Sequence, residues 1–155
     1  MTTFGSEKIR EAACHLIACL AEAGVIGTEA DEQAWDQMIS SSLKRKEENV
    51  QKCAVAAFGA LARFKGIDAE TVKECIDQTI LTRHLYGRRG YALALGAIPF
   101  YIPANFVYLP DVLSALVFAM AIKVTLEFLY HMFGSPISRT NQNGHSQGFT
   151  AGQRC

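Results

Sequence analysis

The amino-acid sequence predicts an all-α fold made of antiparallel helix pairs. Apolar residues recur at the spacing of amphipathic helices in several segments, and polar or glycine-containing breaks separate these segments. In addition, one helical stretch recurs about 40 residues further along the chain. With 155 residues, the chain is long enough for one compact domain or a short run of repeats.

The first two helices are expected between Ser6 and residue 49. Ser6 is suited to begin a helix, and Gly24 is suited to end it. The apolar residues of this first helix form one stripe, which is predicted to face inward: Ile9, Ala12, Ala13, Leu16, Ile17 and Leu20. A second helix is expected from Thr28 or Asp31, and it ends in the polar run 40–49.

Three further helices are expected before Pro99. The segment 47–64 is apolar nearly all round, which predicts a helix buried between neighbours. The segment that follows Asp68 has a single apolar face, formed by Val72, Cys75, Ile76, Thr79 and Ile80. A fifth helix is expected from about Tyr86 to Ile98, where Pro99 ends it because proline cannot continue a helix.

The chain also resembles itself at a regular offset. The residues from Ile9 match those from Val50 at an offset of 41, and 58–61 recurs as 95–98 at an offset of 37. Periods near 40 residues, each with two helices, are typical of HEAT and armadillo solenoids. Residues 1–99 are therefore predicted to form a short HEAT- or armadillo-like α-solenoid. The alternative is a non-repetitive bundle whose alanine-rich helices are alike only in composition.

The chain changes character after Pro99. Residues 100–133 are predicted to form an apolar segment with a buried helix from about Pro110 to Phe133, which would cap the repeats or form an alternative end. A membrane span is the weaker interpretation, because prolines, Lys123 and Glu127 interrupt the uncharged runs. Residues 134–155 are rich in Gly, Ser, Asn and Gln, which predicts a disordered tail.

Charge and cysteine content narrow the range of functions. Lys plus Arg and Asp plus Glu are both 15, so the formal net charge is zero. No overall field attracts nucleic acid or an anionic membrane, so a charged partner would have to be bound by a local patch. We expect no nucleic acid as a partner, and a membrane is the weaker alternative. The five cysteines are an odd number, and the N-terminus lacks the apolar run of a signal peptide. These features predict a cytoplasmic protein with free thiols.

The sequence contains none of the common catalytic or cofactor-binding motifs, such as a phosphate-binding loop, a dinucleotide fingerprint or a zinc-protease helix. Cys14, His15 and Cys19 are close in sequence, but their spacing on one helix does not let them converge on a metal. His84 and His131 have no catalytic partner at helical spacing. We therefore expect a protein that is not an enzyme and has no catalytic residue, cofactor or metal.

Two groups of basic residues remain to be explained. The run 44–46 is followed directly by Glu47 and Glu48, which predicts a self-neutralised loop. The arginines of 83–89 have no acidic neighbour in the sequence, and arginine and tyrosine are enriched in protein-binding hot spots. The candidate partner-binding residues are Arg83, Arg88, Arg89 and Tyr91. In the alternative interpretation, these arginines bind carbonyls or carboxylates of the neighbouring repeat.

Two segments resemble a known family. The segment Glu48–Leu61 and, above all, Thr82–Pro99 with its run Arg89-Gly90-Tyr91-Ala-Leu-Ala-Leu-Gly-Ala-Ile-Pro99 resemble the HEAT-repeat region of tubulin-folding cofactor D (tubulin-specific chaperone D). The resemblance covers about residues 1–99, and the run 89–99 is its most specific part. From residue 100 onward the chain departs from the family, and it is much shorter than a family member.

The resemblance implies a function in the folding of tubulin. Members of this family are long, cytoplasmic α-solenoids of the microtubule cytoskeleton that bind β-tubulin. They act with other tubulin-folding cofactors and an Arf-like small GTPase, and they promote GTP hydrolysis by tubulin during assembly and disassembly of the heterodimer. For this chain the resemblance implies a chaperone segment that binds β-tubulin without catalytic residues of its own. A small membrane-associated helical protein, anchored through residues 91–133, is the alternative.

Overall fold

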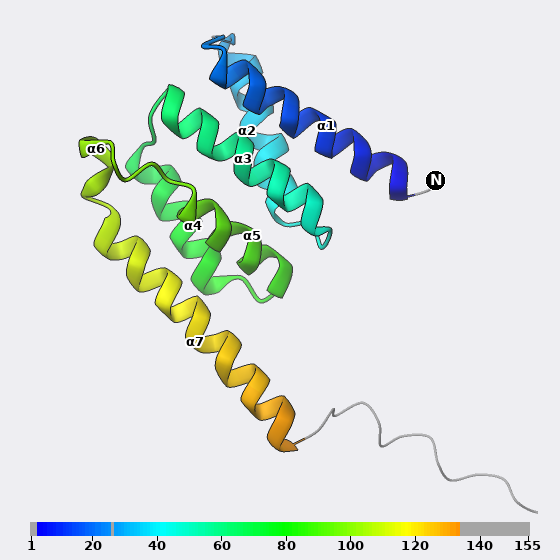
Figure 1. Cartoon of the computed structure of the whole chain (residues 1–155), viewed down its shortest axis with the longest axis vertical. Helices are drawn as coiled ribbons and strands as arrows, with labels where there is room; N and C mark the ends of the chain where they lie inside the picture. Colours follow the sequence, from blue (N-terminus) through cyan, green and yellow to red (C-terminus); the bar gives the residue numbers. More distant parts are fainter. Residues whose placement is uncertain (1–2, 26, 134–155) are drawn as a thin grey trace, which may run out of the picture. The chain divides into compact units, whose positions relative to one another are not determined.

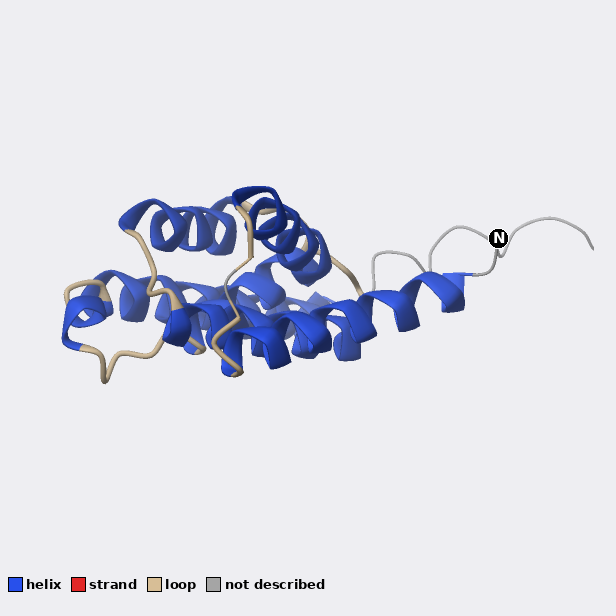
Figure 2. Cartoon of the chain, turned by 90° about the horizontal axis from the view of Figure 1, so that it is seen from above, coloured by secondary structure: helices blue, strands red, loops and turns tan. Residues whose placement is uncertain are grey.

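The structure is a computed structural model that describes residues 3–25 and 27–133. The described residues form seven helices and no strand (Figures 1 and 2). The helices are α1 (Thr3–Glu22), α2 (Glu29–Leu43), α3 (Glu48–Phe64), α4 (Ala69–Leu81), α5 (Leu85–Gly96), α6 (Pro103–Phe106) and α7 (Leu109–Phe133). The prediction of an all-α fold is confirmed for this part of the chain, and the predicted tail 134–155 lies outside it.

The chain divides into two units, Met1–Ala121 and Ile122–Cys155. The first unit holds α1 to α6 and the beginning of α7, and the second holds the remainder of α7. The first unit extends well past residue 99, because Val112 and Ala115 of α7 belong to the same apolar core as Ile98.

The helix ends follow from local side-chain chemistry. Thr28 and Asp31 form a capping box at the start of α2, in which the Thr28 hydroxyl accepts from the Asp31 N–H at 3.3 Å and the Asp31 carboxylate accepts from the Thr28 N–H at 2.9 Å. At α4, the Asp68 carboxylate accepts from the Thr71 N–H at 2.7 Å. Gly24 and Gly66 follow α1 and α3 with φ of 70° and 82°, values that glycine adopts without strain.

Small side chains hold the first unit together. Alanines predominate where α1 packs lengthwise on α3, and they let two helix backbones approach closely. The buried residues of these two helices include Cys14, Ile17, Ala18 and Ala21 on α1 and Ala54, Ala57, Ala60 and Leu61 on α3. Close packing also joins α4 to α5, α2 to α3, and α3 to α5.

The inward face of α1 agrees only in part with the prediction, since Ile17 of the predicted stripe is buried. Ile9 and Leu16, which were expected to face inward, are 68% and 59% exposed. The buried face passes through Cys14, Ile17 and Ala21, and its centre lies about a third of a turn around the helix from Ile9 and Leu16, at about 3.6 residues per turn. Because α1 is apolar on more than one side, its periodicity alone does not determine which side meets α3.

The predicted buried helix 110–133 is helical, but it is not buried. Among its described side chains, Val112 and Ala115 are buried, and both lie in its first two turns. Large apolar side chains further along are exposed, including Val117, Met120, Val124, Phe128 and Met132. The prediction of a buried helix was therefore wrong for most of its length, because most of its described side chains are exposed.

Candidate functional site

The candidate site is built where the turn between α2 and α3 meets the beginning of α5. Gln51 of α3 is fully buried at this junction. Its Nε2 atom lies within hydrogen-bond distance of three carbonyl oxygens, those of Leu43 at 2.8 Å, Arg45 at 2.7 Å and Tyr86 at 2.6 Å. An amide nitrogen carries two hydrogens, so these carbonyls share them. One side chain thus connects three backbone segments.

Arg89 completes the junction. Its Nε donates to Oε1 of Gln51 at 2.6 Å, and its Nη2 donates to the carbonyl of Lys46 at 3.0 Å. Hydrogen bonds that involve a charged donor are stronger than neutral ones. Arg89 therefore fastens α5 to the turn that precedes α3, as the alternative interpretation of the arginines predicts.

Gly90 makes this close packing possible. A Cβ atom at position 90 would collide with the carbonyl group of Leu43. In contrast, a Cβ at Gly96, at the other end of α5, would meet nothing within 4 Å. Residue 90 has to be glycine because the backbone of α5 lies against the end of α2 at this point.

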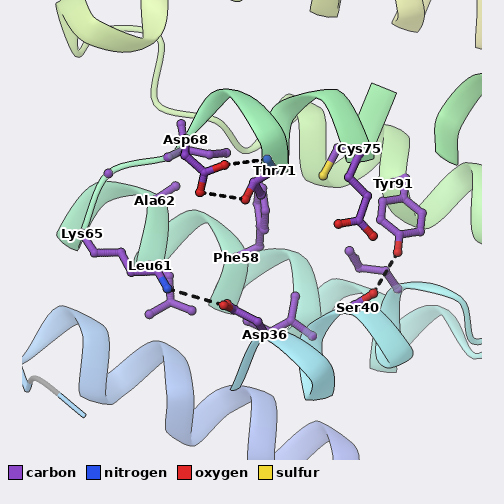
Figure 3. A pocket seen from close by; sticks show the side chains of 15 residues that line it. Asp36, Ser40, Phe58, Leu61, Ala62, Lys65, Asp68, Thr71, Cys75 and Tyr91 are labelled. Atoms are coloured by element: carbon purple, nitrogen blue, oxygen red, sulfur yellow. Dashed lines mark hydrogen bonds and ion pairs between the residues drawn. The ribbon is translucent and has the colours of Figure 1, made fainter. Parts of the chain in front are cut away.

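Tyr91 lies in the core, which corrects its prediction as a partner-binding residue. Its ring is 2% exposed, and its hydroxyl lies 3.0 Å from Oγ of Ser40 (Figure 3). The ammonium group of Lys44 lies 5.8 Å from the ring centroid, within the range of a cation–π contact. A buried ring with a satisfied hydroxyl stabilises the fold and is not available to a partner.

The other two arginines differ in their surroundings. The Nη2 of Arg88 donates to the Thr82 carbonyl at 2.8 Å, so part of its guanidinium closes the turn between α4 and α5. Arg83 is exposed in that turn. The structure therefore places Arg83 where a partner can reach it. Arg88 and Arg89, in contrast, form hydrogen bonds within the chain.

Sequence reasoning missed Gln51 and the proximity of the two basic groups. Gln51 lies beside Lys52 in the polar first turn of the segment 47–64, so the sequence gives no signal of its burial. The meeting of 44–46 with 88–89 has no signal either, because it depends on how α5 packs.

A cavity of about 210 Å³ lies beside this junction, between α2, α3 and α4 (Figure 3). Lys65 at its rim pairs with Glu32 at 3.5 Å and with Asp36 at 3.6 Å, and Asp68 is used as the cap of α4. The cavity is smaller than the roughly 300–1,000 Å³ of most small-molecule sites. Of its charged lining residues, Asp36, Lys65 and Asp68 already have partners, and the small volume of the cavity does not suggest a ligand.

Cys14, His15 and Cys19, which are close in the sequence, do not converge on one point where a metal ion could bind. Cys14 is buried in the core, whereas Cys19 is exposed and its Sγ lies 3.8 Å from Nε2 of the exposed His15. Within residues 3–25 and 27–133, no group of three His, Cys, Asp or Glu residues could hold a metal ion. Burial raises the pKa of the Cys75 thiol to about 12 and also raises that of Cys14.

The helix from Leu109 to Met132 is long and apolar enough to cross a membrane, and only 11% of its most apolar stretch is buried. By contrast, Tyr91, Ala94 and Leu95 belong to the core, so the segment 91–98 has no role in such a span. Comparison of the chain with family models, curated proteins and solved structures finds no match.

Proposed function

We propose that this chain is a helical-repeat binding scaffold of the tubulin-folding cofactor D type, with β-tubulin as its partner. The observation that carries the proposal is the run 89–99, which is the most specific part of the resemblance. In this run Arg89 and Gly90 join α5 to the turn between α2 and α3, and Leu95 lies in the core. The run is thus suited to the junction between successive helical repeats.

The same proposal describes the helices as a short HEAT-like solenoid. Here α1 and α2 are one repeat, α3 and α4 the next, and α5 begins a third. Two features support it: α1 packs on α3, and α3 packs on α5, as equivalent helices of consecutive repeats do. The offset of 41 residues between Ile9 and Val50 relates the same two helices, α1 and α3.

Co-migration with tubulin tests this proposal. The full chain is mixed with purified αβ-tubulin heterodimer and run on a size-exclusion column, beside each protein alone. We expect the chain to elute with tubulin, and circular dichroism of the free chain establishes that it is helical. A chain that is helical and monodisperse, but elutes apart from tubulin at micromolar concentrations of both, would contradict the proposal.

Membrane attachment is a second candidate function, and the exposure of α7 favours it. At about 1.5 Å per residue, the 24 residues of Leu109–Met132 extend over about 36 Å, and the hydrocarbon core of a bilayer is about 30 Å thick. Lys123 and Glu127 lie within this stretch, but they pair with each other at 3.9 Å. Such pairing lowers the cost of taking two charges into lipid.

Flotation with neutral phosphatidylcholine vesicles tests membrane attachment. We expect the chain to float with the vesicles and to resist extraction at alkaline pH. Val117 and Val124 are exposed on α7, so Val117→Lys with Val124→Lys should release the chain from the vesicles without disturbing the core. The matched control is Val117→Ala with Val124→Ala, which should still float. Complete recovery of the unmodified chain in the soluble fraction would exclude this function.

A further inference from the structure

Two groups of cations that lie about 40 residues apart in the sequence meet at one end of the first unit. The turn between α2 and α3 and the turn between α4 and α5 lie at the same end of this unit (Figure 1). We call their cations the basic patch. It consists of Lys44, Arg45 and Lys46 from the first turn and Arg83, Arg88 and Arg89 from the second turn and α5.

Hydrogen bonds fix the two halves of the basic patch to each other. Arg89 donates to the carbonyl of Lys46, and Gln51 donates both to the carbonyl of Arg45 and to that of Tyr86. The backbones that carry the cations are therefore tied together through buried groups. A surface held in this way loses less conformational entropy on binding than a mobile one.

The basic patch keeps an excess of positive charge despite its two glutamates. Glu47 forms an ion pair with Arg45 at 3.0 Å, and Glu48 forms one with Lys52 at 2.8 Å. Lys44, Lys46 and Arg83 are exposed, and none of the three forms an ion pair with another described residue. These three cations are the ones a partner would meet first.

Apolar surface lies directly beside these charges. Leu85 and Tyr86, in the first turn of α5, are 62% and 52% exposed. The guanidinium of Arg89 lies 6.0 Å from the centroid of the Tyr86 ring. An aromatic ring bordered by cations is a common composition for the centre of a protein-binding surface.

We propose that the basic patch binds a short acidic peptide segment of a partner protein. Carboxylates of the peptide pair with Lys44, Lys46 and Arg83, and an apolar side chain of the peptide packs on Leu85 and Tyr86. The glutamates within the patch and the zero net charge of the chain disfavour a continuous phosphate backbone, which needs an uninterrupted basic surface. A short peptide has only to place its carboxylates on Lys44, Lys46 and Arg83, and it need not follow the surface over Glu47 and Glu48.

This proposal is independent of the one concerning β-tubulin, because it defines the chemistry of a ligand and not the protein that carries it. A synthetic peptide therefore tests it without tubulin. The probe is a fluorescein-labelled peptide of alternating glutamate and glycine with one central phenylalanine. Its binding to the full chain is followed by fluorescence anisotropy at low and at physiological salt.

Two double variants make the test specific. Lys46→Gln with Arg83→Gln removes two exposed cations of the patch that take no part in the Gln51 junction through their side chains. Arg63→Gln with Lys73→Gln removes the same charge elsewhere, since Arg63 lies about 18 Å along α3 from Gln51 at about 1.5 Å per residue. We expect the patch variant to weaken peptide binding about tenfold and the control to change it less than about twofold.

Three results would overturn the proposal. The first is that the unmodified chain does not bind the peptide at low salt. The second is that the two double variants weaken binding equally, which would indicate nonspecific attraction. The third is that a single-stranded oligonucleotide of the same charge binds more tightly than the peptide, which would assign the patch to nucleic acid.

Discussion

The carbonyl group of Leu43, the last residue of α2, occupies the space that a side chain at Gly90 of α5 would need. Two helices whose contact residues are 47 positions apart in the chain therefore meet backbone to backbone. The hydrogen bonds of Gln51 and Arg89 surround this point. The close approach at Gly90 determines where α5 lies on the earlier helices.

Replacement of Gly90 by alanine should destabilise the fold. The added methyl group must push α5 away from Leu43, and such overpacking costs about 1–3 kcal/mol of unfolding free energy. Gly96→Ala, in the same helix, is the matched control. Its Cβ has open space, so no loss of stability is expected there. Urea unfolding followed by circular dichroism compares the two, and equal stabilities would show that α5 does not pack as described.

Replacement of Gln51 by methionine should also be costly, although the two side chains have similar size. The change removes the Gln51 amide from the carbonyls of Leu43, Arg45 and Tyr86 and from the Nε of Arg89. A buried polar group that is left without a partner costs about 1–3 kcal/mol. Gln37→Met, at an exposed position of α2, provides the control and should be nearly neutral. A Gln51→Met variant as stable as the Gln37→Met variant would contradict the role of this junction.

Stability should fall in acid partly because two helix caps become protonated. The hydrogen bond from the Thr71 N–H is the main reason that the pKa of Asp68 lies below its ordinary value of 3.8, and the Thr28 hydroxyl lowers that of Asp31. A depressed pKa contributes stability that is present above the unfolded-state value and is lost as the pH falls through the folded-state value.

The loss from these caps should thus begin near pH 4 and continue below it. Asp68→Asn keeps a side-chain acceptor for the Thr71 N–H without the titrating charge. The difference in unfolding free energy between the unmodified chain and this variant should shrink as the pH is lowered from 6 to 3. A difference that stays constant over this range would mean that the Asp68 charge does not contribute to the cap.

The cysteines should differ sharply in reactivity. The thiolate is the reactive form, and burial keeps Cys75, with its pKa of about 12, and Cys14 as thiols at neutral pH. Cys19 is exposed on α1. Brief treatment of the native chain with iodoacetamide should label Cys19, and Cys75 should react only after unfolding in urea. Peptide mass spectrometry measures both, and labelling of native Cys75 at the rate of Cys19 would contradict its burial.

Most of the helices could be predicted from the sequence because their signals are local, although α6 was not predicted and α1 begins at Thr3, before the expected Ser6. Thr28 and Asp68 begin helices through their own side chains, and Gly24 and Gly66 end them through their own backbone conformation. Each of these signals acts within a few residues. No neighbouring helix is needed to recognise them.

Packing could not be predicted in the same way. The apolar faces of α1 compete, and only the position of α3 decides that Cys14 faces inward and Leu16 does not. Likewise, arginine and tyrosine occur both in protein-binding surfaces and in tight junctions between helices, so their presence in the sequence does not distinguish the two. The hydrogen bonds of Arg89 and the burial of Tyr91 assign both to the junction.

The shared amide of Gln51 has a consequence for the way these helices come apart. In a linear array of repeats, the terminal units can fray one after another, because each contacts only its neighbours. Here the departure of α5 would strip Gln51, a buried residue in the first turn of α3, of the Tyr86 carbonyl and of Arg89 together. Opening at α5 and loosening of α3 therefore become a single cooperative event, and slow amide hydrogen exchange should extend across both helices in unison.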